Sequence, residues 1–489
     1  MGSRQLAFTF ADSPSGSGSS PESNAFDLEA ALLRIVEAMP APDPITPGLI
    51  PTDRLLDRVA SLHNLAAALS RVARNKGAPG IDGKSVDEVV LAAYTLLPQL
   101  RQALLTGTYQ PGDVRRVWIP KPGGGQRGLG IPNVIDRVVQ QAILHYLEVI
   151  YEPTFHPSSH GFRRCRGAHT AIAEAKTYVE AGYGIVVDID LAKFFDRVHH
   201  QRLLSRLGQR IGDSRLLRLI GQMLKAKVVL PDGTRVSTEE GTPQGGPLSP
   251  LLSNIVLDEF DQELKRRGLR FVRYADDCNI FVRSERAGQR VMSAVRRFLE
   301  ERLRLQVNEE KSKVALPEEI HFLGFTLGTT SSGRVMVQIS ARTKDRIDTR
   351  IRELTPRNWG RSLSSCLDRM NLYLKGWVNY FRIVTKEGAA IFERLDAHIR
   401  RRLRAIIVRQ KKRPSHLFHH LRRRCATART AANAAYCQRG PWYKSRTSGL
   451  HIAYPNAWFA ERLVSLWSTW DRFQPRKPEV LVQRQLFEL

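Results

Sequence analysis

Hydrophobic and polar positions change their period several times along this chain, which predicts a mixture of helices and strands. Apolar residues recur at helical spacing over about 53–74, 86–106 and 133–151. Two stretches instead surround turn residues with strand-forming residues, VRRVWIPKPGGGQRGLGIP (114–132) and KVVLPDGTRVST (227–238). Each of these two stretches predicts a β-hairpin.

The middle of the chain alternates between strands and helices without a simple repeat. It opens on the apolar run GIVVDID (184–190), and a later hairpin, RFVRYADDCNIFVRS (271–285), is followed by a predicted helix over 287–304. The order lacks the regular β-α repeat of a doubly wound sheet, so it indicates an α+β fold with an antiparallel sheet. After about residue 340 the pattern changes to long helices rich in Arg, Leu and Ile.

Charge is unevenly distributed between these two parts. The chain carries 75 Lys and Arg against 48 Asp and Glu, a formal net charge of +27. Residues 331–489 hold 33 basic and 11 acidic side chains, a net charge of +22. A local excess of this size is expected of a protein that binds a phosphate backbone. An anionic membrane surface is an alternative, but no lipidation signal accompanies the charge.

Other features of the composition narrow the class of protein. The five cysteines are scattered without a C-x-x-C pair, which argues against structural zinc and against a disulfide framework. No window has the apolar length of a membrane span, and the first residues do not read as a secretion signal. Residues 1–52 are low in complexity and predict a flexible segment. We expect a cytoplasmic, nucleoid-associated protein.

Carboxylates stand out at two places in this basic chain. Asp276 and Asp277 fall at the tip of the 271–285 hairpin, where Asp is also an ordinary turn residue. GIVVDID contains Asp188 and Asp190, and we expect strand alternation to direct only one of them at a shared site. If that residue lies beside the hairpin tip, three carboxylates converge and require divalent cations. Two magnesium ions would suit such a site and would support nucleotidyl transfer.

Seven sequence blocks resemble those of reverse transcriptases encoded by group II introns. RYADDCNIFV resembles the family's Y-x-D-D hairpin, and VDIDLAKFFDRVHH resembles its first catalytic-carboxylate motif. The other five follow the family's order and are RRVWIPKPGGGQRGLGIPNVIDRVVQQAI, SSHGFRRCRGAHTA, GTPQGGPLSPLLSNIVLDEFD, VNEEKSKV and HFLGF. The likeness covers roughly residues 70–330, and GWVNYFRI and RGPWYKSRT extend it more weakly.

The resemblance implies a right-hand polymerase followed by basic helices. Fingers and a palm with an antiparallel sheet would span 53–330, and a helical thumb, the maturase domain, would span 331–415. A basic, DNA-binding-like extension would occupy 416–489. Some relatives add an H-N-H endonuclease with paired cysteines, which this sequence does not show, so the likeness is to the branch that lacks it.

The implied activity is that of an RNA-directed DNA polymerase, which adds dNTPs to a primer 3′-OH with two Mg²⁺ ions. The protein would also bind intron RNA and assist splicing and mobility. Its partners would be template RNA, intron RNA, a DNA target or primer, and dNTPs, and a homodimer stays open. Two alternatives remain: a domesticated relative working in defence or repair, and an RNA-binding splicing factor with little polymerase activity.

The resemblance also assigns catalytic residues. Asp190, Asp276 and Asp277 match the catalytic and metal-binding trio, because DLAKFFD aligns from Asp190. We expect Asp190 and Asp276 to be the direct metal ligands, with Asp277 adding charge nearby.

Nucleotide-binding roles follow in the same way. Phe195 would crowd the sugar 2′ position and exclude ribonucleotides. Lys121 and Arg127 flank the glycine-rich turn that would clamp the triphosphate, and Lys311 would lie near the phosphates. Gln244 would pack against the incoming nucleotide, within a PQGG stretch whose two glycines allow close backbone approach.

Primer and template contacts are assigned to Arg163, Leu323 and Gly324. Arg164 and Cys165 stand where many relatives have Pro-Gly, a departure that affects this loop. Aromatic residues farther along could stack on bases or fill a small core, and the core is the preferred interpretation for most of them: Trp442, Tyr443, Trp458, Trp467 and Trp470.

Overall fold

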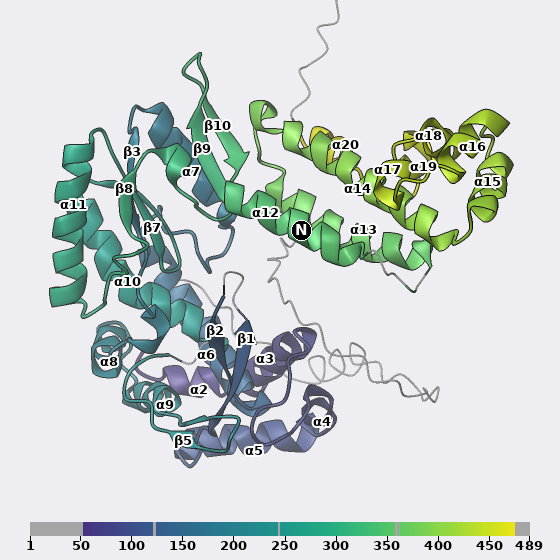
Figure 1. Cartoon of the computed structure of the whole chain (residues 1–489). Coiled ribbons are helices and arrows are strands. Elements are labelled where there is room, and N and C mark those ends of the chain that lie inside the picture. The colour runs from purple at the N-terminus through teal and green to yellow at the C-terminus, as the bar shows by residue number, and fades with distance from the viewer. Residues whose placement is uncertain (1–51, 121–123, 243–244, 357–359, 361, 475–489) are drawn as a thin grey trace, which may run out of the picture. The chain divides into compact units, whose positions relative to one another are not determined.

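A computed structural model of the protein (Figure 1) describes residues 52–120, 124–242, 245–356, 360 and 362–474. These residues form two compact units, divided between Leu316 and Pro317. The N-terminal segment, Lys121 and Gln244 lie outside the described residues. No helix in the described part of the chain is long and apolar enough to cross a membrane.

A helical cluster and a small sheet begin the first unit. The sheet has the strand order β2-β1-β4-β5, and its two antiparallel hairpins confirm those predicted over 114–132 and 227–238. The strands are β1 (Val114–Pro120), β2 (Gln126–Ile131), β4 (Val228–Val229) and β5 (Arg235–Val236). The helices are α2 (Leu55–Val59), α3 (Leu62–Arg74), α4 (Val86–Leu91), α5 (Ala93–Thr106) and α6 (Val134–Tyr151), followed by the 3₁₀ turn Glu152–Thr154.

The second sheet of this unit is antiparallel and has the strand order β6-β7-β3-β8. Helix α7 packs against β6, and α11 packs against β3 and β8. The strands are β3 (Ile185–Ile189), β6 (Arg270–Tyr274), β7 (Asp277–Val282) and β8 (Lys313–Ala315). The helices are α7 (Ala168–Glu180), α8 (His200–Gly208), α9 (Ser214–Leu224), α10 (Ser249–Arg266) and α11 (Glu285–Arg297), with short turns at Phe194–Asp196 and Phe298–Arg302. The predicted α+β class with an antiparallel palm sheet is therefore confirmed.

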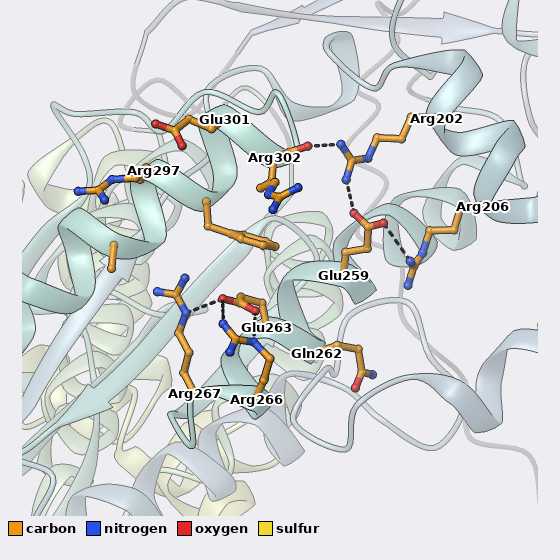
Figure 2. A pocket seen from close by; sticks show the side chains of 12 residues that line it. Arg202, Arg206, Glu259, Gln262, Glu263, Arg266, Arg267, Arg297, Glu301 and Arg302 are labelled. Carbon is orange, nitrogen blue, oxygen red and sulfur yellow. Dashed lines mark hydrogen bonds and ion pairs between the residues drawn. The ribbon is translucent and has the colours of Figure 1, made fainter.

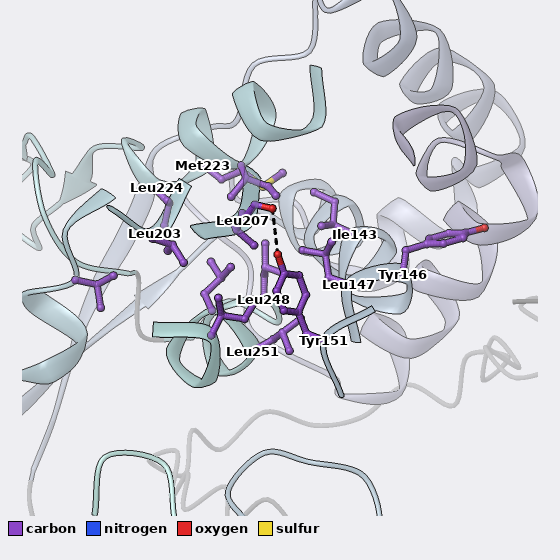
Figure 3. Close-up of a cluster of buried hydrophobic side chains, with 14 of the residues drawn as sticks. Ile143, Tyr146, Leu147, Tyr151, Leu203, Leu207, Met223, Leu224, Leu248 and Leu251 are labelled. Carbon is purple, nitrogen blue, oxygen red and sulfur yellow. Dashed lines mark hydrogen bonds between the residues drawn. The ribbon is translucent and has the colours of Figure 1, made fainter. Parts of the chain in front are cut away.

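One continuous hydrophobic core runs through the first unit. Figure 3 shows the part where α6 meets α8, α9 and α10 through Leu147, Leu207, Leu224 and Leu251. The hydroxyl of Tyr151 in the same cluster donates a hydrogen bond of 3.1 Å to the Leu207 carbonyl, which satisfies a buried polar group. This core supports the sheet that carries the predicted catalytic residues.

The second unit is a hairpin followed by helices. Strands β9 (Phe325–Thr329) and β10 (Val335–Ile339) pair in antiparallel fashion. The helices are α12 (Ala341–Leu354), α13 (Leu363–Phe381), α14 (Ala390–Gln410), α15 (Pro414–Arg423), α16 (Ala428–Ala435), α17 (Pro441–Lys444), α18 (Ser448–Ala453), α19 (Asn456–Ala460) and α20 (Leu466–Arg472). Aromatic rings fill its core, with Phe392 stacked on Trp470 at a centroid distance of 5.8 Å.

Two details differ from the sequence prediction. Strand β10 was not predicted, because a strand of five residues gives only a weak alternating pattern. The clearer sign of the hairpin is the turn residue Gly333, which adopts a φ of +78°. The helix predicted over 287–304 ends as regular α-helix at Arg297 and continues as one π-helical turn, Phe298–Arg302.

Candidate active site

The tip of the β6–β7 hairpin carries two of the predicted catalytic residues. Tyr274 pairs with Asp277 across the hairpin, so Ala275 and Asp276 form a two-residue turn. Ala275 has a φ of +57°, in the left-handed region that the tightest hairpin turns require. The turn confirms the predicted hairpin and places the Asp276 and Asp277 side chains at its end.

Strand β3 lies beside β7 and brings the third carboxylate. Ile189 is opposite Cys278, so Asp190 follows β3 at the same end of the sheet as Asp277. The expectation that only one of Asp188 and Asp190 would face this end was wrong. Residues two apart on a strand share a face, and the charges of both aspartates raise the pKa of Asp277.

Repulsion among these carboxylates is the main electrostatic property of the site. Burial, followed by the charges of Asp276, Asp188 and Asp190, raises the pKa of Asp277 to about 7. Burial also raises the pKa of Asp188 to about 6, and Asp190 adds to this shift. Burial and Asp190 raise the pKa of Asp276, whereas Arg127 opposes the increase. Such a cluster is stabilised by nearby cations.

Lys311 supplies one such cation. Its Nζ lies 3.4 Å from Asp190 Oδ2. The loop that carries Lys311 also holds the backbone of Asp190, because Ser312 Oγ accepts a 3.0 Å bond from the Asp190 amide. The Asn308 amide donates a 2.8 Å bond to the Asp190 carbonyl. The VNEEKS loop therefore fixes the backbone at Asp190, the first of the predicted catalytic carboxylates.

A buried arginine supports the hairpin from behind. The Arg273 guanidinium pairs with Asp261 of α10 at 2.6 Å, and the two side chains are 1% and 0% exposed. It donates further bonds of 2.8 Å to the Ala275 carbonyl, 3.0 Å to Asn254 Oδ1 and 2.8 Å to Ser159 Oγ. Sequence reasoning missed this network, although an arginine inside the apolar run RFVRY already required an acidic partner.

The SSHGF loop packs directly on the catalytic turn. The His160 amide donates to the Arg273 carbonyl at 2.8 Å, and Asn254 donates to the Gly161 carbonyl at 2.9 Å. A Cβ on Gly161 would lie 2.3 Å from the Ala275 nitrogen, so only glycine fits there. On α7, Glu174 Oε2 lies 2.7 Å from His160 Nε2, which ties the loop to that helix.

Arg163 also belongs to this loop but points into the protein. It is 5% exposed, and its guanidinium bonds to the Glu152 carboxylate at 2.9 Å and to the carbonyls of His156 and Ser159 at 2.7 and 2.8 Å. These bonds shape the loop. A contact between Arg163 and primer or template stays a prediction.

Of the residues predicted to bind the nucleotide, Arg127 lies close to the carboxylates, and Phe195 lies beside the loop that leads into PQGG. Arg127 is close enough to Asp276 to lower its pKa. Phe195 is half-buried beside Phe194, at a centroid distance of 5.3 Å, and Phe194 is the ring that enters the core. The Thr242 amide donates to the Phe195 carbonyl at 2.6 Å, so the loop leading into PQGG lies beside Phe195.

The two glycines of PQGG approach protein closely. A Cβ on Gly245 would lie 2.3 Å from the Gly130 carbonyl oxygen of β2, and one on Gly246 would lie 2.3 Å from Gln140 Oε1 of α6. Contacts with β2 and α6 therefore require glycine at both positions. Packing of this loop against the incoming nucleotide stays a prediction.

Leu323 and Gly324 form a turn in the second unit. Their φ angles are +53° and +87°. The Leu323 carbonyl accepts a 3.0 Å bond from the Tyr380 hydroxyl, and the Gly324 carbonyl accepts a 3.0 Å bond from Thr343 Oγ1. Helices α12 and α13 thus fix the turn, and its contact with a primer stays a prediction.

An arginine-lined cavity of about 780 Å³ also opens in the first unit (Figure 2). Glu259 bonds to Arg202 and Arg206, and Glu263 bonds to Arg266 and Arg267 at 2.7 Å. None of the predicted site residues that the structure describes lines this cavity. Most of its charge is paired within the protein, so it is a network of ion pairs between helices rather than part of the carboxylate site.

The carboxylates suit a metal that completes its coordination with substrate. Among the described residues, no three His, Cys, Asp or Glu side chains are arranged to hold one ion together. Magnesium is commonly bound by one or two carboxylates, with waters and substrate phosphates completing its shell. Asp190 and Asp276, predicted as the direct ligands, match that partial set.

Comparison with known proteins is consistent with this geometry. Residues 119–327 match the family "Reverse transcriptase (RNA-dependent DNA polymerase)", and residues 344–425 match "Group II intron, maturase-specific domain". Protein YkfC of Escherichia coli (strain K12) is 36% identical over 315 residues, which cover 56% of this chain and 82% of YkfC.

Two further similarities are weaker. The group II intron-encoded protein LtrA of Lactococcus lactis subsp. cremoris is 30% identical over 49% of this chain, and the match spans about half (51%) of LtrA. The solved partial Cas6-RT-Cas1–Cas2 complex is 25% identical over 53% of this chain and 43% of that chain, with a TM-score of 0.33, too low to add to the fold. The two family matches and YkfC show that the chain belongs to the group II intron-encoded reverse transcriptases with a maturase domain, a family of RNA-directed DNA polymerases.

Proposed function

We propose that this chain copies RNA into DNA by extending a primer 3′-OH with dNTPs, and that it binds the RNA of a group II intron to assist splicing and mobility. The observation that carries the first part is the convergence of Asp190, Asp276 and Asp277 where β3 and the β6–β7 hairpin end. The reverse transcriptase family uses divalent metals, and two Mg²⁺ ions at these carboxylates would activate the primer hydroxyl and stabilise the leaving pyrophosphate.

The protein's own residues would orient the reactants. Asp190 and Asp276 would hold the metals, and Asp277 would add negative charge beside them. Arg127, with Lys121 on the other side of the glycine-rich turn, would bind the triphosphate oxygens. Lys311 would neutralise Asp190 between catalytic cycles and lie near the incoming phosphates. Phe195 would exclude the ribose 2′-OH.

The RNA-binding part rests on charge. Residues 331–489 carry a net charge of +22, and the maturase match covers 344–425 within them. Basic side chains at this density bind phosphate backbones with a strong dependence on salt. A splicing role without DNA synthesis would need an eroded catalytic trio, and here all three aspartates are present.

Primer extension tests the polymerase proposal. The native protein, the double variant Asp276→Asn/Asp277→Asn and the control Asp232→Asn, an exposed aspartate in the β4–β5 turn, would be given an RNA template, a DNA primer, dNTPs and Mg²⁺. We expect synthesis by the native and control proteins, its loss in the double variant, and its loss on adding EDTA. Equal synthesis by all three proteins, or no synthesis by native protein that binds RNA tightly, would contradict the proposal.

A further inference from the structure

A second cavity, of about 450 Å³, lies in the second unit between α12, α14 and the start of α17. Its volume is in the range of sites that bind small molecules. Its lining includes Arg352, His398, Arg402, Ala405, Ile406, Arg409 and Trp442.

Trp442 differs from the tryptophan that builds the core of this unit. Its side chain is 38% exposed, whereas Trp470 is 2% exposed. The Arg401 guanidinium covers one face of the Trp442 ring, 3.7 Å from its centroid, and Arg401 does not line the cavity. Trp442 itself lines the cavity, together with the His398 ring, which meets it edge-on at a centroid distance of 5.9 Å, and the apolar side chains of Ala405 and Ile406.

Three arginines also line the cavity. Arg352 pairs with Asp348, and Arg402 donates a 2.8 Å bond to the Thr355 carbonyl. Arg409 is exposed near the end of α14 and has no ion-pair partner among the described residues. No acidic residue is present in the described lining. The cavity thus combines an aromatic ring with arginine side chains, of which Arg409 has no ion-pair partner in the described part of the chain.

We propose that this cavity holds one unpaired nucleotide of an RNA strand, with its base stacked on Trp442 and its phosphate bound by Arg402 and Arg409. Aromatic stacking and guanidinium contacts are the usual means by which proteins bind unstacked RNA bases. RNA is favoured because the Arg352–Arg409 wall lies within the segment matched by the group II maturase domain. Trp442 lies beyond that segment, so the pocket joins the maturase helices to the residues that follow them. The inference deepens the proposed binding of intron RNA and rests on it.

Photocrosslinking of the full-length protein locates the base directly. The probe is an unstructured 12-nucleotide RNA that carries 5-iodouridine, a base that crosslinks to stacked aromatic side chains. We expect mass spectrometry to find a crosslink at Trp442 in the native protein and none at that site in Trp442→Ala, which has no ring on which the base can stack. Crosslinks confined to other parts of the chain would overturn the proposal.

Affinity measurements separate a binding role from a structural one. Stacking of one base predicts that Trp442→Ala weakens binding of the same fluorescein-labelled RNA by about 5- to 100-fold, and that Trp442→Phe restores most of it. The matched control is Tyr443→Ala, which removes an equally exposed neighbouring ring (41%) that does not line the cavity, and we expect less than about a twofold change. An RNA duplex of the same length should bind Trp442→Ala and native protein equally.

Two results would contradict the assignment. Equal losses for duplex and single strand would mean that Trp442 only supports the fold. If Trp442→Ala weakened the binding of single-stranded DNA as much as the binding of RNA, the choice of RNA as the ligand would be overturned. Primer extension on the same preparations distinguishes the two proposals. If the native protein synthesises DNA but Trp442→Ala binds the RNA as tightly as the native protein, only the pocket is rejected. If the native protein makes no DNA but Trp442→Ala binds the RNA more weakly, only the polymerase proposal is rejected.

Discussion

Arg273 and Asp261 form an ion pair that is sealed from solvent directly behind the catalytic turn. The side chains are 1% and 0% exposed, and the same guanidinium holds the Ala275 carbonyl. Burial lowers the pKa of Arg273, but Asp261 outweighs it and raises the pKa, so the guanidinium stays charged. A buried pair of this kind fixes geometry more than it adds stability.

Removing one partner should therefore be costly. Arg273→Met leaves the Asp261 charge unpaired, and we expect a loss of about 3–5 kcal/mol in the free energy of unfolding. The double variant Arg273→Met/Asp261→Leu should recover much of that stability but not DNA synthesis, because the turn loses its anchor. Urea unfolding and primer extension measure the two effects. Full activity in the stable double variant would show that the anchor is dispensable.

The close approach of Gly161 to the turn predicts a steric defect. Gly161→Ala places a methyl group 2.3 Å from the Ala275 nitrogen, so the hairpin or the loop must move. Displacement of catalytic groups by about 1 Å can cost about 100-fold in rate, and we expect a fall in kcat of about 10- to 100-fold. Gly184→Ala, which meets nothing within 4 Å beside β3, is the control and should retain native kcat.

Phe195 should control the choice between dNTPs and rNTPs. Phe195→Val opens space at the sugar while Phe194 still fills the core, so incorporation of rNTPs relative to dNTPs should rise by about 10- to 100-fold. Phe195→Tyr keeps the ring and should keep the selectivity. Competitive single-nucleotide extension measures the ratio. An unchanged ratio in Phe195→Val would assign Phe195 to packing alone.

The hydrogen bonds that Glu174 accepts predict that the protein loses stability in acid. Burial alone would raise its pKa, but hydrogen bonds from His160, Ser158 and Tyr178 lower the pKa to about 2. Because the folded-state pKa lies below the ordinary 4.5, the stabilisation is fully present above about pH 4.5. It is lost as the pH falls toward 2 and amounts to about 3 kcal/mol.

Glu174→Gln should remove that stabilisation at neutral pH and flatten the decline between pH 4.5 and 2. Glu180→Gln, at the end of the same helix, should leave the decline unchanged. Urea unfolding at several pH values measures both. If the free energy of unfolding of Glu174→Gln declined between pH 4.5 and 2 as steeply as that of the native protein, the acid sensitivity would belong to other carboxylates.

Local patterns were sufficient for much of this fold. Strand-forming residues around DG, PKPGGGQ and RYADDC predicted three hairpins that the structure contains, because turn chemistry and alternation act over a few residues. The position of Asp190 beside Asp277 needed the family resemblance, since nothing in either segment specifies which strands become neighbours.

Long-range partners could not be derived in this way. The arginine in RFVRY required an acid, but α10 offers Asp258, Glu259, Asp261 and Glu263, and only the packed helix selects Asp261. Arg163 was assigned to primer or template contacts, and the sequence did not indicate that the loop folds around its guanidinium. In both cases the local sequence specifies a charge and the tertiary fold decides whether it faces solvent.

The bonds around Ala275 also limit how this polymerase can be recombined with others. The turn is fitted to Gly161 in one segment, to Arg273 in another and to Asn254 and Asp261 in a third. A hairpin grafted alone from a distant homologue would pack against a loop and a helix whose side chains fit a different turn. Chimeras should therefore exchange 158–163, 249–266 and 270–282 together, as a single inherited module.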